Sequence, residues 1–223
     1  MNRPLKGLLV LLLISVLLAG LCACGGSALD AEAFADEAIR ARLTGEAGEE
    51  YAKLAGMKKE NLASAYEQVL KDEADAFAGY FDIDLTLCSE QTRQRIVELY
   101  RKLLPLGKYE VGGSTRSGDS YLVSVTVTPM DIVRQVREKD WQQFQMDWVG
   151  DYASLYEMEP AELEEKWAGQ ILDLFEARLD SVDYLEPETI SIQIVQSKQR
   201  LRQQATSWCC SRNILRRLSC SML

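Results

Sequence analysis

Two spacings of apolar residues alternate along this chain, and they restrict the folds that it can adopt. Over residues 30–105 apolar side chains recur every three or four positions, which is typical of amphipathic helices packed on a core. In SYLVSVTVTP, residues 120–129, β-branched and aromatic residues take every second position, as in a strand with one buried face. A helical spacing returns over 131–179, and ETISIQIVQ at 188–196 alternates again. The chain therefore combines helices with a small sheet.

Local signals mark where the predicted helices begin and end. Asp30 and Ser89 are suited to cap helix N-termini, and Gly45 and Pro105 are suited to end the helices before them. Helical segments are expected at 30–44, 49–80 with an interruption near Gly56, 89–104, 131–148 and 160–179. The segments that precede residue 105 predict a helical layer ahead of the sheet.

The alternating runs predict how the strands pair. KYEVGG at 108–113 and SYLVSVTVTP at 120–129 flank a turn that contains glycine and serine, which indicates an antiparallel hairpin. ETISIQIVQ predicts a third, late strand. Because each run has one apolar face, the simplest architecture is a small antiparallel sheet packed on helices. The predicted fold class is α+β, as a single domain over residues 30–196.

Residues 1–23 have the layout of an export signal. Arg3 and Lys6 supply a positive start, and a nearly unbroken apolar stretch runs from Leu8 to Leu21. The alternative is a transmembrane helix that stays in place. The uncharged stretch from Gly7 to Ala23 has 17 residues, which is at the lower limit of the roughly 17 to 25 needed to span a bilayer. No basic cluster follows it, so an export signal is favoured.

The end of this segment, Leu21-Cys22-Ala23-Cys24, resembles the lipobox of bacterial lipoproteins. In that family a diacylglycerol is transferred to the cysteine thiol, and the chain is cut just before that cysteine. Cys22 as acceptor would put bulky Leu21 beside the cut, whereas Cys24 puts small Ala23 there. The resemblance therefore implies cleavage between Ala23 and Cys24, a lipid on Cys24, and a flexible tether at 24–29. An ordinary secretory cleavage that leaves free thiols is the alternative.

The body also resembles small lipoproteins of Gram-positive bacteria whose domains have no assigned activity. The resemblance rests on an acidic helical start after the lipobox, the hairpin KYEV…YLVSVTVTP ending in proline, and a late β segment. It covers residues 24 to about 196. It implies an architecture and a location, and it supplies no catalytic residues.

Composition excludes several classes of site. The chain contains no histidine, so it cannot by itself supply Ser-His-Asp or Cys-His nucleophilic sites, or zinc sites with histidine ligands. All 34 acidic residues lie between Asp30 and Glu188, with 17 lysines and arginines, which gives a net charge of −17. Such a body repels nucleic acid, and we expect no nucleic-acid partner. Cys88 is the lone cysteine of the body, and we expect a small buried residue.

Residues 197–223 differ from the body. After Val195 there are six lysines and arginines and no acid, and three cysteines fall in the last fifteen residues. One interpretation is that this tail is disordered or is a frameshifted end, since ETISIQIVQ has no evident hairpin mate. The alternatives are a genuine basic arm that touches anionic lipid and a metal site. Adjacent Cys209 and Cys210 are poorly placed for chelation, so we expect no metal.

Aromatic residues on the second helical half supply the candidate binding site. Their spacings of seven, four and four predict either a ligand groove for sugars or peptides or the core face of a helix. The residues concerned are Trp141, Trp148, Tyr152 and Tyr156.

Acidic residues offer a weaker candidate. Asp82 and Asp84 lie in YFDIDLTL, but the glycine and closing glutamate of a calcium loop are absent, so we expect solvated acids. A pair of carboxylates could serve glycoside hydrolysis, although nothing in the sequence marks which two would face each other.

These observations predict a lipoprotein of the cell membrane, anchored at its extracytoplasmic face by diacylglycerol on Cys24. We expect its domain to be a non-enzymatic module without a cofactor, which binds an extracellular protein, a peptide or an envelope component. The alternatives are a carboxylate-based cell-envelope hydrolase and a structural spacer.

Overall fold

The structure, a computed structural model, describes residues 30–118, 120–198 and 206–210. The N-terminal helices are α1 (Ala31–Thr44), α2 (Glu49–Leu54), α3 (Lys59–Tyr80) and α4 (Glu90–Leu103), followed by the 3-10 turn η1 (Leu104–Leu106). The later helical elements are α5 (Ile132–Gln135), the π-helical η2 (Val136–Asp140), α6 (Trp141–Gly150), α7 (Tyr152–Tyr156), α8 (Pro160–Glu176) and the 3-10 turn η3 (Leu179–Ser181). The strands are β1 (Lys108–Ser117), β2 (Ser120–Thr128), β3 (Glu188–Lys198) and β4 (Thr206–Cys210).

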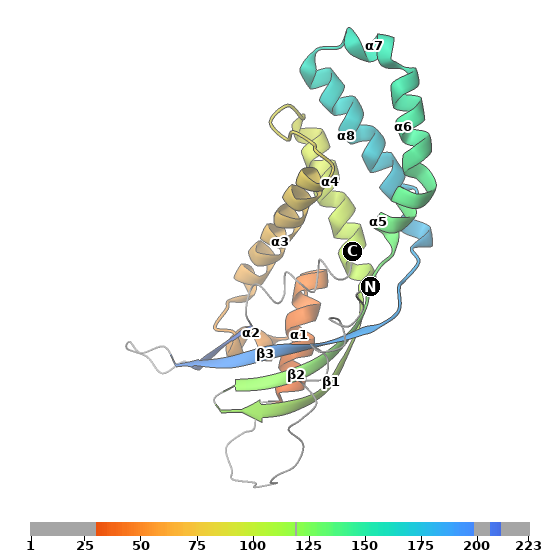
Figure 1. The fold of residues 1–223 in the computed structure, drawn as a ribbon. Coiled ribbons are helices and arrows are strands. Elements are labelled where there is room, and N and C mark those ends of the chain that lie inside the picture. The colour runs from red at the N-terminus through yellow and green to blue at the C-terminus, as the bar shows by residue number, and fades with distance from the viewer. Residues whose placement is uncertain (1–29, 119, 199–205, 211–223) are drawn as a thin grey trace.

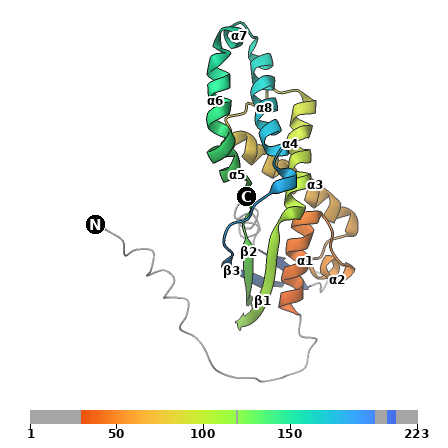
Figure 2. The ribbon, with the colours of Figure 1, turned by 90° about the vertical axis from the view of Figure 1, so that its right-hand side faces the viewer.

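The strands form one antiparallel sheet in the order β1-β2-β3-β4, with helices on one side (Figures 1 and 2). The side chains on the inner face are at most 1% exposed and belong to the common core: Val123, Val125, Val127, Ile192 and Ile194. The outer face carries mainly serine and threonine, with Thr126 Oγ1 and Thr189 Oγ1 3.0 Å apart. One buried and one polar face explain the alternation in sequence. The predicted α+β class and the small antiparallel sheet on helices are confirmed.

Side-chain caps set the ends of the first helices where the sequence predicted them. Asp30 Oδ1 accepts hydrogen bonds from the backbone N–H groups of Glu32 and Ala33, and Ser89 Oγ accepts one from Thr92. Gly45 ends α1 with φ of +75°. A Cβ at Gly45 would lie 2.7 Å from the Tyr66 ring, so this position requires glycine for conformation and for space.

The hairpin differs from the prediction in its turn. β1 continues to Ser117, so the predicted polar turn over 114–119 is in large part strand. The register shifts between Val111 and Ser114, where a bulge takes up the glycine pair of KYEVGG. The Ser114 backbone N–H donates to Glu32 Oε1 at 2.8 Å, which fastens this bulge to the first turn of α1.

The helical segment after Asp131 contains a change of winding. Its buried apolar positions step by four residues from Ile132 to Val136, but Trp141 follows Val136 by five. The π-helical η2 supplies the extra residue, so that α5 and α6 present their apolar residues to the same side. The predicted loop between Gly150 and Glu159 likewise contains the short helix α7. Neither feature follows from a simple helical period.

The C-terminal tail enters the sheet. β4 pairs antiparallel with β3, with Cys209 opposite Val195 and Thr206 opposite Lys198. Part of the segment predicted as a disordered or frameshifted tail over 197–223 is therefore placed as a strand, and ETISIQIVQ does have a mate. Residues 199–205 and 211–223 lie outside the described residues, and the frameshift hypothesis stays a prediction.

We predict that Phe175→Ala destabilises the fold strongly. Phe175 is 2% exposed and its ring lies 5.1 Å from that of Phe77 and 5.3 Å from that of Phe81. Loss of a buried phenylalanine leaves a cavity, and the free energy of unfolding should fall by about 3–5 kcal/mol in urea denaturation. Val149→Ala, at a position 69% exposed, is the control and should change it by less than about 0.5 kcal/mol. Equal effects of the two variants would contradict this assignment of the core.

Candidate functional site

Residues 131–181, from α5 to η3, form a helical arm. α6 and α8 run side by side away from the sheet and are joined by α7 at the far end (Figures 1 and 2). The chain enters and leaves the arm through neighbouring segments, since the Asp131 backbone N–H donates to the Asp183 carbonyl at 2.8 Å. An isolated bridge between Met130 and Tyr184 continues this pairing. The arm is thus fixed at its base by backbone hydrogen bonds.

An aromatic cluster holds α6 against α8 and against the end of α3. Trp167 on α8 packs against three rings of α6. Its ring centroid lies 6.0 Å from that of Trp141, 5.1 Å from that of Phe144 and 5.0 Å from that of Trp148. Trp167 Nε1 also donates to the Phe81 carbonyl at 2.9 Å. Offset and edge-to-face ring pairs of this kind stabilise packing beyond simple burial.

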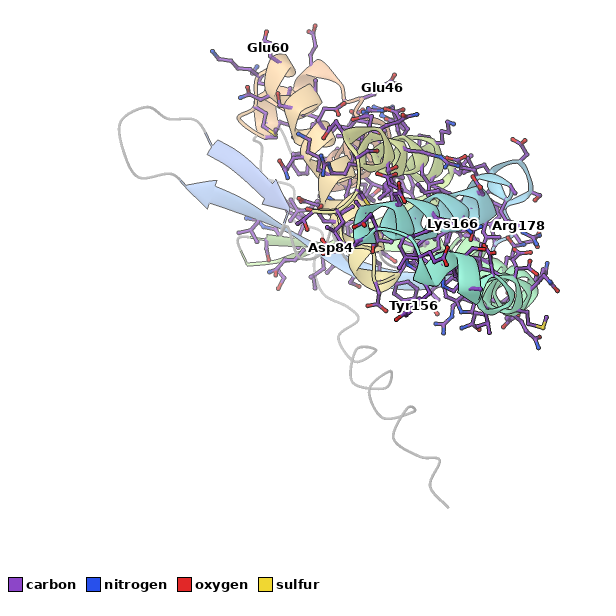
Figure 3. The ribbon with its side chains drawn as sticks, turned by 90° about the horizontal axis from the view of Figure 1, so that it is seen from above. Glu46, Glu60, Asp84, Tyr156, Lys166 and Arg178 are labelled. Atoms are coloured by element: carbon purple, nitrogen blue, oxygen red, sulfur yellow. The ribbon has the colours of Figure 1, made fainter. Side chains whose placement is uncertain are left out.

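The predicted aromatic residues are separated by the structure. Trp141 and Trp148 meet in the cluster and pack, half-buried, against the core. Tyr156 lies on α7 and is 80% exposed (Figure 3). Tyr152 belongs to the same helix, but its side chain is outside the described residues. The two tryptophans therefore support the arm, and the aromatic groove that includes the two tyrosines stays a prediction.

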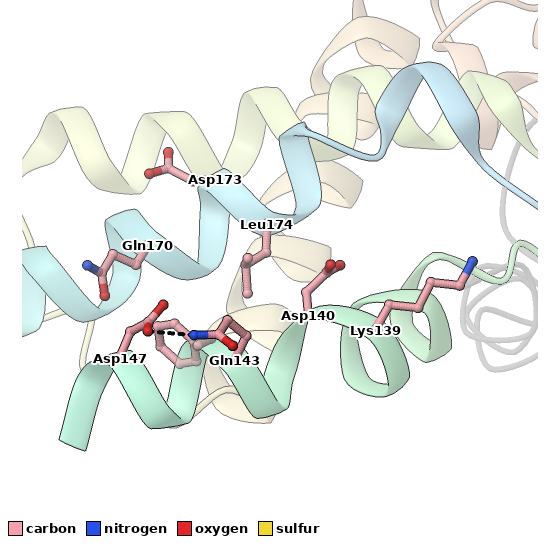
Figure 4. Close-up of a pocket in the computed structure, with 8 residues that line it drawn as sticks. Lys139, Asp140, Gln143, Asp147, Gln170, Asp173 and Leu174 are labelled. Carbon is pink, nitrogen blue, oxygen red and sulfur yellow. Dashed lines mark hydrogen bonds between the residues drawn. The ribbon is translucent and has the colours of Figure 1, made fainter. Parts of the chain in front are cut away.

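A groove with polar and apolar lining runs between α6 and α8 (Figure 4). It encloses about 470 Å³, within the size range of small-molecule and peptide sites. Phe144 and Leu174 supply apolar surface, and amides and charged groups supply the rest: Lys139, Asp140, Gln143, Asp147, Gln170 and Asp173. This groove is our candidate functional site.

Arginines hold two of the groove carboxylates, Asp140 and Asp173. Asp140 binds the Arg178 guanidinium through both oxygens, at 2.6 and 3.0 Å. Asp173 Oδ1 lies 2.5 Å from Nη2 of Arg95. Arg95 also pairs with Glu176, so it links α4 to α8. The pKa of Arg95 is raised, first by its hydrogen bonds to Glu176, which keeps the guanidinium charged. These pairs keep the walls of the groove in place.

Asp147 differs from the other two carboxylates. Its Oδ1 accepts a hydrogen bond from Gln143 Nε2 at 2.7 Å, drawn as a dashed line in Figure 4. Within the described ranges no lysine or arginine makes a salt bridge to it. Its negative charge is therefore available to a ligand. The whole arm has 13 acidic and five basic residues between Asp131 and Asp180, so its net charge is −8.

The acids of YFDIDLTL serve the loop between α3 and α4. Asp84 Oδ1 accepts hydrogen bonds from the hydroxyl and the backbone N–H of Thr86, which lower the pKa of Asp84. The backbone N–H of Asp84 donates to Glu164 at 2.8 Å. Among the described residues no group of acids and cysteines is arranged to hold a metal ion.

Cys88 is buried beside α8. It is 4% exposed, and burial, with Glu165 and Glu164 nearby, raises the pKa of its thiol to about 11. A protonated, enclosed thiol is a poor nucleophile. The structure thus places Cys88 as the small buried residue that the sequence indicated.

Comparisons with known proteins inform the fold. Neither protein-family models nor curated proteins match this chain. Among solved structures, the chain is similar to the crystal structure of "a putative lipoprotein (ycdA)" from Bacillus subtilis, with a TM-score of 0.53 and 14% identity. The match covers 84% of this chain and 53% of the other, so the chain spans about half the length of that protein. At this identity the likeness shows the fold alone.

Two findings concern the predicted anchor. Ala23 and Cys24 lie outside the described residues, so the cleavage and lipidation sites stay predictions. In the described part of the chain, no helix is both long and apolar enough to cross a bilayer.

Sequence reasoning missed the groove residues. Gln143, Asp147, Gln170 and Asp173 occupy polar positions beside the apolar stripes of α6 and α8, where solvated side chains are the usual expectation. Only the pairing of these two helices brings them together. The acidic excess of residues 131–180 was the one signal in sequence that could have pointed to this surface.

We predict that Glu165 stabilises the fold in a pH-dependent way. Burial raises its pKa, but hydrogen bonds from the Thr92 hydroxyl and from Ser89 outweigh this effect, so the pKa is lowered overall. The stabilisation is then fully present above the ordinary carboxyl pKa of 4.5 and is lost as pH falls below it. Glu165→Gln should reduce the free energy of unfolding at neutral pH, and the difference from the native chain should shrink near pH 3.

The measurement is urea unfolding of both chains at each pH. Glu162→Gln is the matched control, because Glu162 is an exposed acid in the first turn of the same helix. It should show only a small change at either pH. A difference for Glu165→Gln that grows toward acid would contradict the sign of the shift.

Proposed function

We propose that this chain is a lipoprotein of the cell membrane, anchored by a diacylglycerol on Cys24 and exposed on the extracytoplasmic face. Its helical arm would bind an extracellular protein, a peptide or a component of the envelope. The similarity of fold to the Bacillus subtilis protein described as a lipoprotein agrees with this proposal. The lipobox Leu21-Cys22-Ala23-Cys24 supplies the anchoring chemistry.

The observation that carries the proposal is the position of the arm relative to the N-terminus. Asp30 lies near the end of the sheet where Glu32 contacts Ser114, and α7 lies at the opposite end of the molecule (Figures 1 and 2). Cys24 precedes Asp30 by six residues, which extend to about 20 Å at most. A lipid on Cys24 would therefore hold the sheet near the membrane and direct the groove away from it.

The state of the carboxylates favours binding over hydrolysis. A glycoside hydrolase needs a general acid whose pKa is raised, opposite a second carboxylate. Among the described residues, the carboxyl groups whose pKa departs from the ordinary range have a lowered pKa, as for Asp131, whose pKa is lowered by its hydrogen bonds and ion pair with Arg134. Asp140 and Asp173 of the groove are held by arginines. The Asp131 carboxylate is therefore a fixed negative charge rather than a proton donor.

We predict that anchoring depends on Cys24. Cells that express the native chain and are fed a palmitate analogue should incorporate the label and retain the protein in the membrane fraction. Cys24→Ala should lose the label, whereas the matched variant Cys22→Ala should keep it, because Cys22 is removed with the signal. Label that persists in Cys24→Ala, or a domain that protease cannot reach on intact cells, would contradict the proposal.

Photo-crosslinking separates a binding module from a structural spacer. A photoreactive amino acid in place of Gln170, in the groove, should crosslink the chain to its partner and give a defined product on intact cells. The same photoreactive amino acid in place of Glu60, which is exposed at the start of α3, should give no crosslinked product. The absence of products from both positions would favour the spacer.

A further inference from the structure

We infer that the groove between α6 and α8 binds a cationic segment of a protein partner, in which a lysine or arginine lies next to an apolar residue. This inference deepens the proposed function and depends on it for its biological setting. It rests on three properties of the groove: its two-walled shape, its free carboxylate and its apolar floor.

The groove has a fixed geometry. Asp140 at the end of η2 and Gln143 and Asp147 on α6 line the groove at intervals of three and four residues, so they cover about 10 Å of its length. Gln170 and Asp173 face it from α8. The aromatic cluster beneath, in which Phe144 is 7% exposed, packs the two walls against each other. A segment that lies along this groove therefore meets polar groups on both sides.

Charge assigns the position of the partner's cations. At one end Asp140 is occupied by Arg178, and Lys139 adds a positive charge. Toward the other end Asp147 has no cationic partner within the described residues, whereas Asp173 is paired with Arg95. A lysine or arginine of the partner would therefore lie beside Asp147. The net charge of −8 on the arm would steer such a partner toward it.

The remaining lining explains why the ligand should be a peptide segment. Leu174 and Phe144 offer apolar surface between the polar walls, which suits an aliphatic side chain. The amides of Gln143 and Gln170 can donate to and accept from a backbone. A nucleic acid would be repelled by the carboxylates, and a sugar would lack the positive charge that Asp147 favours.

The test uses the purified full chain in detergent micelles. The probe is a short fluorescent peptide in which lysines alternate with leucine and alanine, and its anisotropy reports binding. Asp147→Lys should weaken binding about tenfold at low salt, since a favourable charge becomes unfavourable. Raising the salt concentration should weaken binding to the native chain and reduce this difference.

Asp72→Lys is the matched control. Asp72 on α3 accepts a hydrogen bond from Gln68 four residues earlier at 2.8 Å, just as Asp147 accepts one from Gln143. Both variants thus make the same change of charge and lose the same kind of hydrogen bond. Asp72→Lys should bind the probe within about twofold of the native chain. Unfolding temperatures of the two variants, measured alongside, should agree.

Two peptide controls test the remaining contacts. A peptide with glutamate in place of lysine should not bind, and one with serine in place of leucine should bind more weakly.

Several results would overturn the inference. Equal weakening by Asp72→Lys and Asp147→Lys would indicate attraction to the acidic surface in general. Native binding that is unchanged in Asp147→Lys would place the peptide elsewhere, and failure of the native chain to bind it would exclude this partner class. A neutral oligosaccharide that occupies the groove in its place would do the same. None of these outcomes affects the palmitate labelling or the crosslinking, which test the proposed function separately.

Discussion

The contact between α4 and α8 is the interaction on which the rest of the molecule depends. Ile171, Leu172 and Phe175 of α8 are almost fully buried in the core shared with the N-terminal helices. Polar contacts fix this packing at both ends, since Glu165 binds the start of α4 and Arg95 of α4 binds Asp173 and Glu176. With α8 fixed, α6 can pack on it through the tryptophans. The arm is therefore an extension of the core rather than a separate flap, and the walls of the groove are packed on that core.

This arrangement separates the two roles that we propose for the chain. The sheet and α1 lie at the end that follows the predicted lipid anchor, and the acidic groove lies on the arm at the other end. The acidic body repels the anionic headgroups of a membrane, which favours an orientation with the arm away from the surface. Two of the groove carboxylates, Asp140 and Asp173, are ion-paired, and Phe144 and Leu174 give the groove an apolar floor. A groove with these properties suits the binding of a partner, as we propose.

How far the sequence predicted the structure depended on the range of the interaction concerned. Asp30, Ser89 and Gly45 were identified correctly because a cap is decided by hydrogen bonds and backbone angles within four residues. The strand β4 was missed because TSWCC has no strand pattern of its own, and it pairs with the edge that β3 offers. The π-helical η2 was missed because a five-residue step between Val136 and Trp141 reads as an irregular α-helix.

The sequence by itself determined the α+β class, the ends of the first helices and the acidic charge of the body. These depend on local periodicity, on capping and on composition, which are independent of how distant segments meet. The tertiary structure alone decided that Trp141 and Trp148 pack against Trp167, and that Asp147 of α6 shares a groove with Asp173 of α8. Residues that far apart in the chain come together only when a common core is buried, and no local pattern encodes which helix faces will meet.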